Sequence, residues 1–207
     1  MTTTQTADGF DKAAQARGRR LLLGVAALFF VPLALSFWLY YAGGWRPAGT
    51  TNKGELITPA RPLENVPFTL PDGTTSARAD LFKNKWTLLY FGAGRCATED
   101  CRHALWVMRQ TRQLLAADID RVQRVFIARN ECCDLDFLAK EHAGLEVVRA
   151  DDPSTADFFA QFPSQDQATS IYVVDPLGNL MMRWDTRENP KGLLSDMKKL
   201  LKLSHIG

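Results

Sequence analysis

The chain has 207 residues, which is enough for one domain of typical size together with a short tail and an anchor. Its formal net charge of +2 is close to neutral, so the charge gives no reason to expect nucleic acid as a partner. Hydrophobic residues make up 46% of the chain, a content that excludes an intrinsically disordered protein.

The first element is an uncharged apolar stretch, residues 21–41, with the sequence LLLGVAALFFVPLALSFWLYY. A helix needs ~20 such residues to cross the hydrocarbon core of a membrane. A cleaved signal peptide is the alternative, but its apolar region is usually ~7–15 residues long. We therefore expect an uncleaved single transmembrane helix. More cations precede the stretch than follow it within a similar distance: Lys12, Arg17, Arg19 and Arg20 before it, Arg46 and Lys53 after it.

The positive-inside rule then predicts residues 1–20 as a cytoplasmic tail and the rest of the chain outside the cytoplasm. Residues 42–64 contain Gly, Thr and Pro and few apolar side chains, which is typical of a linker. Residues 65–207 are left as the folded domain.

The first half of this domain predicts a strand, a helix and a second strand. Residues 85–92 (KWTLLYFG) form a short apolar run that is typical of a strand buried on both faces. Residues 101–117 carry apolar side chains at helical spacing, and Thr98 or Asp100 can cap the start of this helix. Residues 122–128 alternate between side chains of different polarity, as is typical of a strand. A unit of strand, helix and strand is almost always right-handed with parallel strands.

The second half predicts a hairpin followed by a helix. Residues 170–174 and 180–184 are expected to pair through a type I turn at Asp175-Pro176-Leu177-Gly178. A last helix is expected to begin at Pro190, where proline fits the first turn. Between the halves we expect a helix, a strand at 145–148 and a helix at 154–161. This order predicts the α/β fold class, as a thioredoxin-like domain with a central mixed sheet flanked by helices.

Four cysteines follow the two predicted strands: Cys96 and Cys101 come after the first, Cys132 and Cys133 after the second. Because the carboxyl ends of parallel strands meet at one edge of a sheet, all four sulfurs could share one site. A thiol at a helix N-terminus has its thiolate favoured by the helix dipole.

Three interpretations of these cysteines stay open. They could form structural disulfides, exchange with the disulfides of a partner, or bind a soft metal such as Cu(I) or Zn(II). The separation of Cys96 from Cys101 is wider than a redox CxxC motif, so spacing does not decide. His103 is a further candidate metal ligand. We expect His142 and His205 to be solvated, and Asp134 and Asp136 to cap a helix rather than to act in catalysis.

Several segments together resemble a known family of membrane-anchored thioredoxin-like proteins. The segments are WTLLYFGAGRC at 86–96, DIDRVQRVFIA at 118–128, IYVVDPLGNLMMRW at 171–184 and KKLLKLSHIG at 198–207. The family is related to the Sco/SenC copper proteins and is associated with cytochrome c oxidase assembly in bacteria. The resemblance covers roughly residues 63–207.

The resemblance implies candidate site residues. Sco/SenC proteins bind copper with two cysteines spaced CxxxC and a histidine just before a late strand. The matching cysteines are Cys96 and Cys101, with one more residue between them, and the histidine position falls near Gln167. Glutamine is a poor ligand for a soft metal, so Cys132, Cys133 or His103 would have to supply the third donor. The usual thioredoxin cis-proline position falls at Thr169.

The sequence therefore favours a Sco-like accessory factor of the bacterial inner membrane with a periplasmic domain. It would handle copper, or the thiol state of copper ligands, through Cys96 and Cys101, which would be redox-active thiols in an oxidoreductase. The expected partners are cytochrome c oxidase subunits or other assembly factors. The alternatives are a non-catalytic membrane-tethered binding module and a thiol–disulfide oxidoreductase of broader range.

Overall fold

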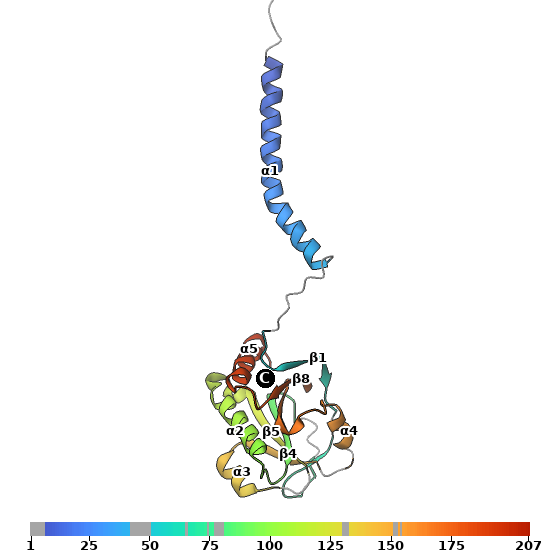
Figure 1. The fold of residues 1–207 in the computed structure, drawn as a ribbon, viewed down its shortest axis with the longest axis vertical. Helices are drawn as coiled ribbons and strands as arrows, with labels where there is room; N and C mark the ends of the chain where they lie inside the picture. The colour runs from blue at the N-terminus through green and yellow to red at the C-terminus, as the bar shows by residue number, and fades with distance from the viewer. Residues whose placement is uncertain are drawn as a thin grey trace, which may run out of the picture. The chain divides into compact units, whose positions relative to one another are not determined.

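The computed structural model describes residues 7–41, 51–64, 66–73, 75–76, 81–129, 133–150, 153 and 155–207. Side chains are described from residue 15 onward within these ranges, except at residues 75 and 76. The chain divides into two compact units, Met1–Gly49 and Thr50–Gly207 (Figure 1).

The first unit is the helix α1, Ala7–Tyr41, which contains the predicted transmembrane stretch. Within α1, the segment Gln15–Tyr41 is long and apolar enough to cross a membrane. The helix begins earlier than residue 21 because alanine, lysine, glutamine and arginine, which favour helices, are frequent in residues 11–20. Most of the predicted tail is therefore helical.

The second unit is built on one mixed sheet. Among the described residues this sheet has eight strands in the order β1-β8-β7-β4-β5-β6-β2-β3. The strand β4 runs parallel to β5 and antiparallel to β7, and β5 runs parallel to β6. The strands are β1 Glu55–Pro62, β2 Phe68–Thr69, β3 Thr75–Ser76, β4 Trp86–Ala93, β5 Val122–Arg129, β6 Leu145–Arg149, β7 Ser170–Val174 and β8 Asn179–Asp185.

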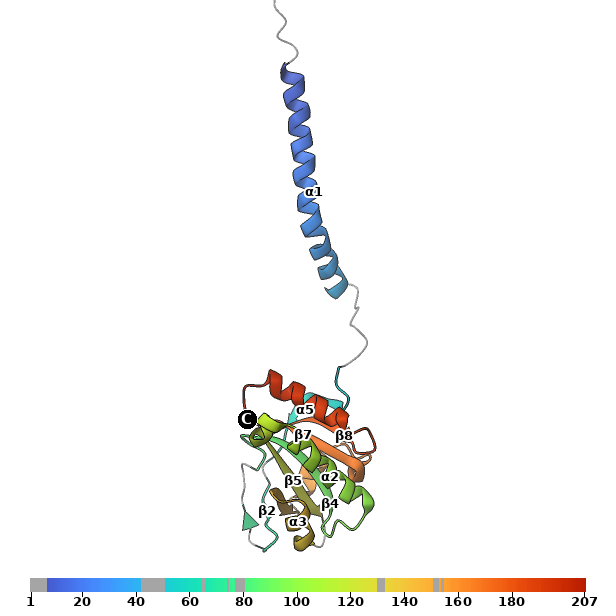
Figure 2. The same ribbon diagram turned by 90° about the vertical axis from the view of Figure 1, so that its left-hand side faces the viewer.

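Helices cover both faces of this sheet. Figure 1 shows α2, α3 and α5 on one side of the sheet and α4 on the other, and Figure 2 turns the first side toward the viewer. The helices are α2 Glu99–Gln113, α3 Leu135–Glu141, α4 Thr155–Ala160 and α5 Lys191–Leu203, with the 3₁₀ turns η1 Ala116–Arg121 and η2 Gln167–Thr169. The predicted mixed sheet flanked by helices is thus confirmed.

The strand β4 explains why the core lies on both faces. Leu88 and Tyr90 point into the cluster beneath α2 and α5, whereas Leu89 and Phe91 point into the cluster beneath α4. All four side chains are buried. A strand covered on both faces needs a continuous apolar run, which is the pattern of this segment.

The predicted hairpin of β7 and β8 forms, and Asp175 holds its turn. Its Oδ1 atom accepts hydrogen bonds from the backbone N–H groups of Leu177 at 2.9 Å and Asn179 at 2.8 Å. Gly178 has φ +90°, a left-handed conformation that glycine adopts without a steric penalty. A short polar side chain and a glycine at fixed positions therefore specify this turn.

One strand lies where a linker was expected. The strand β1 falls inside residues 42–64 and pairs antiparallel with β8, with Leu56 opposite Met182. Just before it, the buried carboxylate of Asp196 accepts hydrogen bonds from the N–H groups of Lys53 at 2.7 Å and Gly54 at 2.9 Å. This strand could not be predicted, because most of its side chains are exposed and show no apolar alternation.

Candidate functional site

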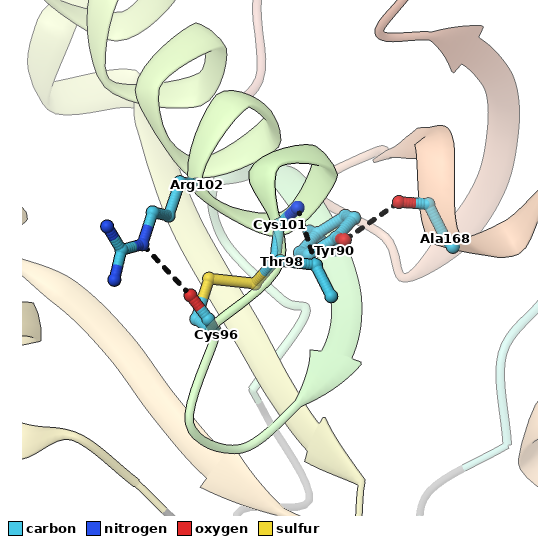
Figure 3. The surroundings of a disulfide bond; sticks show 6 residues. All are labelled: Tyr90, Cys96, Thr98, Cys101, Arg102 and Ala168. Atoms are coloured by element: carbon cyan, nitrogen blue, oxygen red, sulfur yellow. Dashed lines mark hydrogen bonds between the residues drawn. A yellow bond between two sulfur atoms is a disulfide. The ribbon is translucent and has the colours of Figure 1, made fainter.

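A disulfide joins Cys96 to Cys101 at the carboxyl end of β4, with a Cα–Cα distance of 5.3 Å. Cys96 lies in the loop after the strand, and Cys101 lies in the first turn of α2 (Figure 3). Both residues are buried, with exposed fractions of 1% and 2%. An external thiol therefore reaches either sulfur only if the loop at 94–98 moves.

The loop is held in a tight conformation by its own backbone and by α2. The N–H of Cys96 donates to the Ala93 carbonyl at 2.9 Å, and Cys96 has φ +46°. A non-glycine residue in this left-handed region is strained by about 1–2 kcal/mol. Such strain is frequent at functional sites, where contacts with the surrounding structure hold the backbone in an unfavourable conformation.

The start of α2 is capped as the sequence predicts. Thr98 is the N-cap, and its Oγ1 accepts a hydrogen bond from the N–H of Cys101 at 3.3 Å. The guanidinium of Arg102 donates through Nε to the Cys96 carbonyl at 3.4 Å (Figure 3). Because both contacts are to residues of the disulfide, the helix start and the loop are fixed as one piece.

Tyr90 connects the disulfide to the η2 turn. Its hydroxyl donates to the Ala168 carbonyl at 2.8 Å, and its ring lies beside Cys101 (Figure 3). Burial, and to a smaller extent the charge of Asp100, raises the pKa of Tyr90, so the phenol stays protonated. Sequence reasoning missed this residue. A tyrosine within a fully buried strand was the available signal, since a buried hydroxyl usually finds a partner.

Of the second cysteine pair, one residue is among those that the structure describes. Cys133 is disulfide-bonded, half-buried and packed against the same cluster that contains Cys96 and Cys101. Cys132 lies outside the described residues. The parallel pairing of β4 with β5 is as predicted, and it brings the loop with Cys133 to the same edge of the sheet as the first pair.

His103 lies on another side of α2 than Cys101. It follows Cys101 by two residues, which places it ~200° around the helix, and it is exposed. Its Nε2 is 3.1 Å from the Thr186 carbonyl, and since a carbonyl only accepts, this nitrogen carries the proton. Its ring stacks on Trp106. Nδ1 is then the nitrogen that His103 could offer to a metal.

Gln167 occupies the place where the resemblance implies a histidine, and both ends of its amide are engaged. Its Oε1 accepts from Arg129 Nη2 at 2.9 Å, and its Nε2 donates to the Pro163 carbonyl at 3.0 Å. The Arg129 guanidinium lies over the Phe159 ring, 3.9 Å from its centroid. Among the described residues, no three His, Cys, Asp or Glu side chains form a group that could hold a metal ion.

The solvated environment expected for His142 is wrong. The residue is 4% exposed, because it ends α3 and packs against Phe137. Burial, followed by the charges of Arg109 and Arg124, lowers the pKa of His142 to about 4. His205 is exposed as expected, and Asp134 caps α3 by accepting from the N–H of Phe137.

Comparison with known proteins gives a family for the sequence and similar folds for the structure. The family model described as the C-terminal domain of transmembrane-like, thioredoxin-like proteins matches residues 86–204. Together with α1, this match indicates a single-pass membrane protein. No curated protein matches the sequence.

Three solved structures of Sco proteins are similar to this chain. Apo Sco1 from Thermus thermophilus is 20% identical with a TM-score of 0.56, and the match covers 74% of this chain and 99% of that one. Yeast Sco1 with copper bound is 15% identical with a TM-score of 0.54, covering 74% and 95%. BsSco, described as having a disulfide switch and as belonging to a family of cytochrome c oxidase assembly proteins, is 19% identical with a TM-score of 0.51, covering 70% and 96%. These similarities establish a thioredoxin-like fold, as predicted.

Proposed function

The chain belongs to the family of transmembrane-like, thioredoxin-like proteins, and on this basis we propose that it is a membrane-anchored, Sco-like accessory factor in cytochrome c oxidase assembly. It acts through Cys96 and Cys101 on copper or on the thiol state of copper ligands. The observation that carries the proposal is the disulfide between these two residues at the carboxyl end of β4. In α/β proteins this edge of the sheet is where ligands bind and chemistry occurs.

The orientation is part of the proposal. The excess of arginine and lysine before the apolar segment supports an N-terminus in the cytoplasm and a domain in the periplasm of a bacterial inner membrane. Disulfides persist in that compartment, whereas the cytosol keeps thiols reduced. Cytochrome c oxidase subunits or other assembly factors are the proposed partners.

The thiol chemistry needs the two cysteines, a partner disulfide and, for the next round, a dithiol reductant. In the reduced pair, one thiolate attacks the partner disulfide, and a mixed disulfide forms while one partner thiolate leaves. The second cysteine then attacks the mixed disulfide. The Cys96–Cys101 disulfide forms, the partner leaves with two thiols, and two electrons have passed to it. A dithiol reductant returns these electrons.

Copper is the proposed cargo of the reduced pair. Two thiolates are suitable ligands for Cu(I), whereas the amide of Gln167 is a hard donor with both ends in hydrogen bonds. A third ligand would come from Cys132, Cys133 or His103. The Gln167→His variant is therefore expected to bind Cu(I) more tightly than the parent chain.

An anaerobic Cu(I) titration of the reduced full chain in detergent separates the two chemistries. Binding that the Cys96→Ser/Cys101→Ser variant loses and the Cys132→Ser/Cys133→Ser variant keeps would assign copper to the first pair. Equal binding in all three chains would remove copper from the proposal and leave the thiol role.

The proposal as a whole is tested in cells. Cells that lack the native chain and carry the Cys96→Ser/Cys101→Ser variant are expected to have low oxidase activity. Normal oxidase activity in these cells, at equal levels of the protein, would overturn both roles of the cysteines.

A non-catalytic binding module is the second candidate, and the burial of the disulfide favours it. With exposed fractions of 1% and 2%, neither sulfur is open to an external thiol unless the loop at 94–98 moves, as is typical of a structural bond. If the cysteine-free variant keeps oxidase activity and still co-purifies with a membrane complex, this candidate is correct. Trapping of several unrelated partners as mixed disulfides would instead favour a thiol–disulfide oxidoreductase of broader range.

A further inference from the structure

A cationic cavity lies between the C-terminal half of α2 and the end of α3, and the cysteine site does not use it. Its volume is about 330 Å³. The charged side chains that line it are four cations and one carboxylate: Arg109, Arg112, Arg124, Lys140 and Glu141. The lining therefore has a formal charge of +3 at neutral pH.

Arg124 is the buried centre of this charge. It lies in β5, where it pairs with Leu88 of β4 and Leu145 of β6, and it is 3% exposed. Its Nη2 donates to the Ala143 carbonyl at 2.7 Å. Its Nε and Nη1 atoms are buried and have no hydrogen-bond partner among the described residues. A buried guanidinium with two unused donors is costly unless an acceptor reaches it.

The neighbouring groups do not neutralise Arg124. The Arg112 guanidinium donates through Nε to the Val122 carbonyl at 2.6 Å, and Arg109 pairs with Glu141 at 3.6 Å. The one lining carboxylate is therefore already shared with another arginine. Burial, followed by the charges of Arg112 and Arg109, lowers the pKa of Arg124 to about 10. The lining of the cavity thus carries positive charge that its one carboxylate does not compensate.

We propose that this cavity binds a small oxyanion of the phosphate or carboxylate type. Guanidinium groups match both anions because their planar N–H donors fit two oxygens at once. The bound anion offsets the repulsion among the three arginines that line the cavity. Lys140, which is exposed at the rim, adds a fourth charge.

The test measures the thermal stability of the full chain in a nonionic detergent with inorganic phosphate, with acetate, or with sodium chloride at equal ionic strength. Phosphate or acetate is expected to raise Tm by about 3 °C at ten times its Kd, since a ligand that binds the folded state stabilises it. Sodium chloride controls for screening of the cations. If neither oxyanion raises Tm beyond sodium chloride, the proposal is wrong.

Variants distinguish the cavity from the rest of the surface. Arg124→Met keeps an unbranched apolar stem and removes the charge, so we expect it to lose the response to the oxyanion without a lower Tm in sodium chloride. Lys140→Gln changes an exposed residue and is expected to weaken the response at least threefold in Kd. Lys202→Gln removes an exposed charge elsewhere and should respond as the parent does. An equal response in Arg124→Met and the parent would overturn the proposal.

Measurements of Tm on the full chain in nanodiscs distinguish a lipid phosphate group from a free phosphate ion. If phosphatidylglycerol raises Tm above the value in phosphatidylcholine and Arg124→Met abolishes the difference, the oxyanion is a lipid headgroup. If inorganic phosphate alone has this effect, it is a free ion. Either outcome supports the oxyanion site.

Discussion

Gly92 faces Cys101 so closely that a β-carbon added to Gly92 would lie 3.2 Å from the Cys101 Sγ atom. The same β-carbon would lie 3.0 Å from Tyr90 Cε1 and 3.1 Å from Phe126 Cε2. A side chain at this position would therefore press on the disulfide and on two buried aromatic rings. The absence of a β-carbon at Gly92 is a condition for seating the disulfide against β4.

The Gly92→Ala variant is accordingly expected to be less stable by about 1–3 kcal/mol, the usual cost of overpacking a core. Urea unfolding monitored by circular dichroism measures this loss. Gly192→Ala is the control, because its added β-carbon would approach Cβ of the exposed Lys53 and Nε1 of Trp184 but neither cysteine of the disulfide, and alanine favours the helix. Equal stability of Gly92→Ala and the parent would show that the site adjusts without cost.

Reduction of the Cys96–Cys101 disulfide is expected to lower the free energy of unfolding by about 2 kcal/mol. The bond closes a short loop, with a sequence separation of 5, and a short loop restricts the unfolded chain less than a long one does. Urea unfolding of the Cys132→Ser/Cys133→Ser variant with and without a phosphine reductant isolates this bond. An unchanged midpoint would contradict the prediction.

Removal of the Tyr90 hydroxyl is expected to speed reduction of the disulfide. Tyr90→Phe leaves the Ala168 carbonyl without this donor and costs about 1 kcal/mol, so the η2 turn beside the disulfide opens more often. The rate of reduction by dithiothreitol should rise about fivefold. Tyr172→Phe is the matched control, since its hydroxyl donates to Pro163 on the opposite face of the sheet. Equal rates in the two variants would argue against the link.

The buried His142 predicts a loss of stability in mild acid. Its pKa is about 4 in the folded chain and near 6.5 in the unfolded chain, so the unfolded state binds more protons between these values. The contribution of His142 is complete above about pH 6.5 and is lost as the pH falls toward 4. The full change is about 3 kcal/mol.

Urea unfolding of the His142→Leu variant between pH 7 and pH 4 checks this slope. The variant has no imidazole to charge, so its stability should fall less than that of the parent. His205→Leu changes an exposed histidine and is expected to follow the parent curve. If His142→Leu and the parent lose stability equally, His142 is not the source of the pH dependence.

Patterns along the chain were sufficient for the elements near the disulfide. The buried strand, the capping threonine and the Asp–Pro–Leu–Gly turn depend on local residues, and local spacing therefore predicted β4, the start of α2 and the hairpin. The apolar stretch of α1 could be identified for the same reason. The position of Cys96 and Cys101 between a buried strand and a helix was enough to nominate them as site residues, whereas their pairing with each other was left open and is given by the structure.

The partners of these elements were decided by the tertiary structure. The strand β1 forms because β8 offers it a free edge and Asp196 binds its start, and neither contact leaves a pattern in residues 55–62. The burial of His142 and the crowding of Arg109, Arg112 and Arg124 likewise depend on how α2, α3 and β5 pack. Local spacing determined which segments form helices and strands and where the cysteines lie along the chain. Long-range packing decided which polar groups are buried, because burial depends on neighbours that are distant in the sequence.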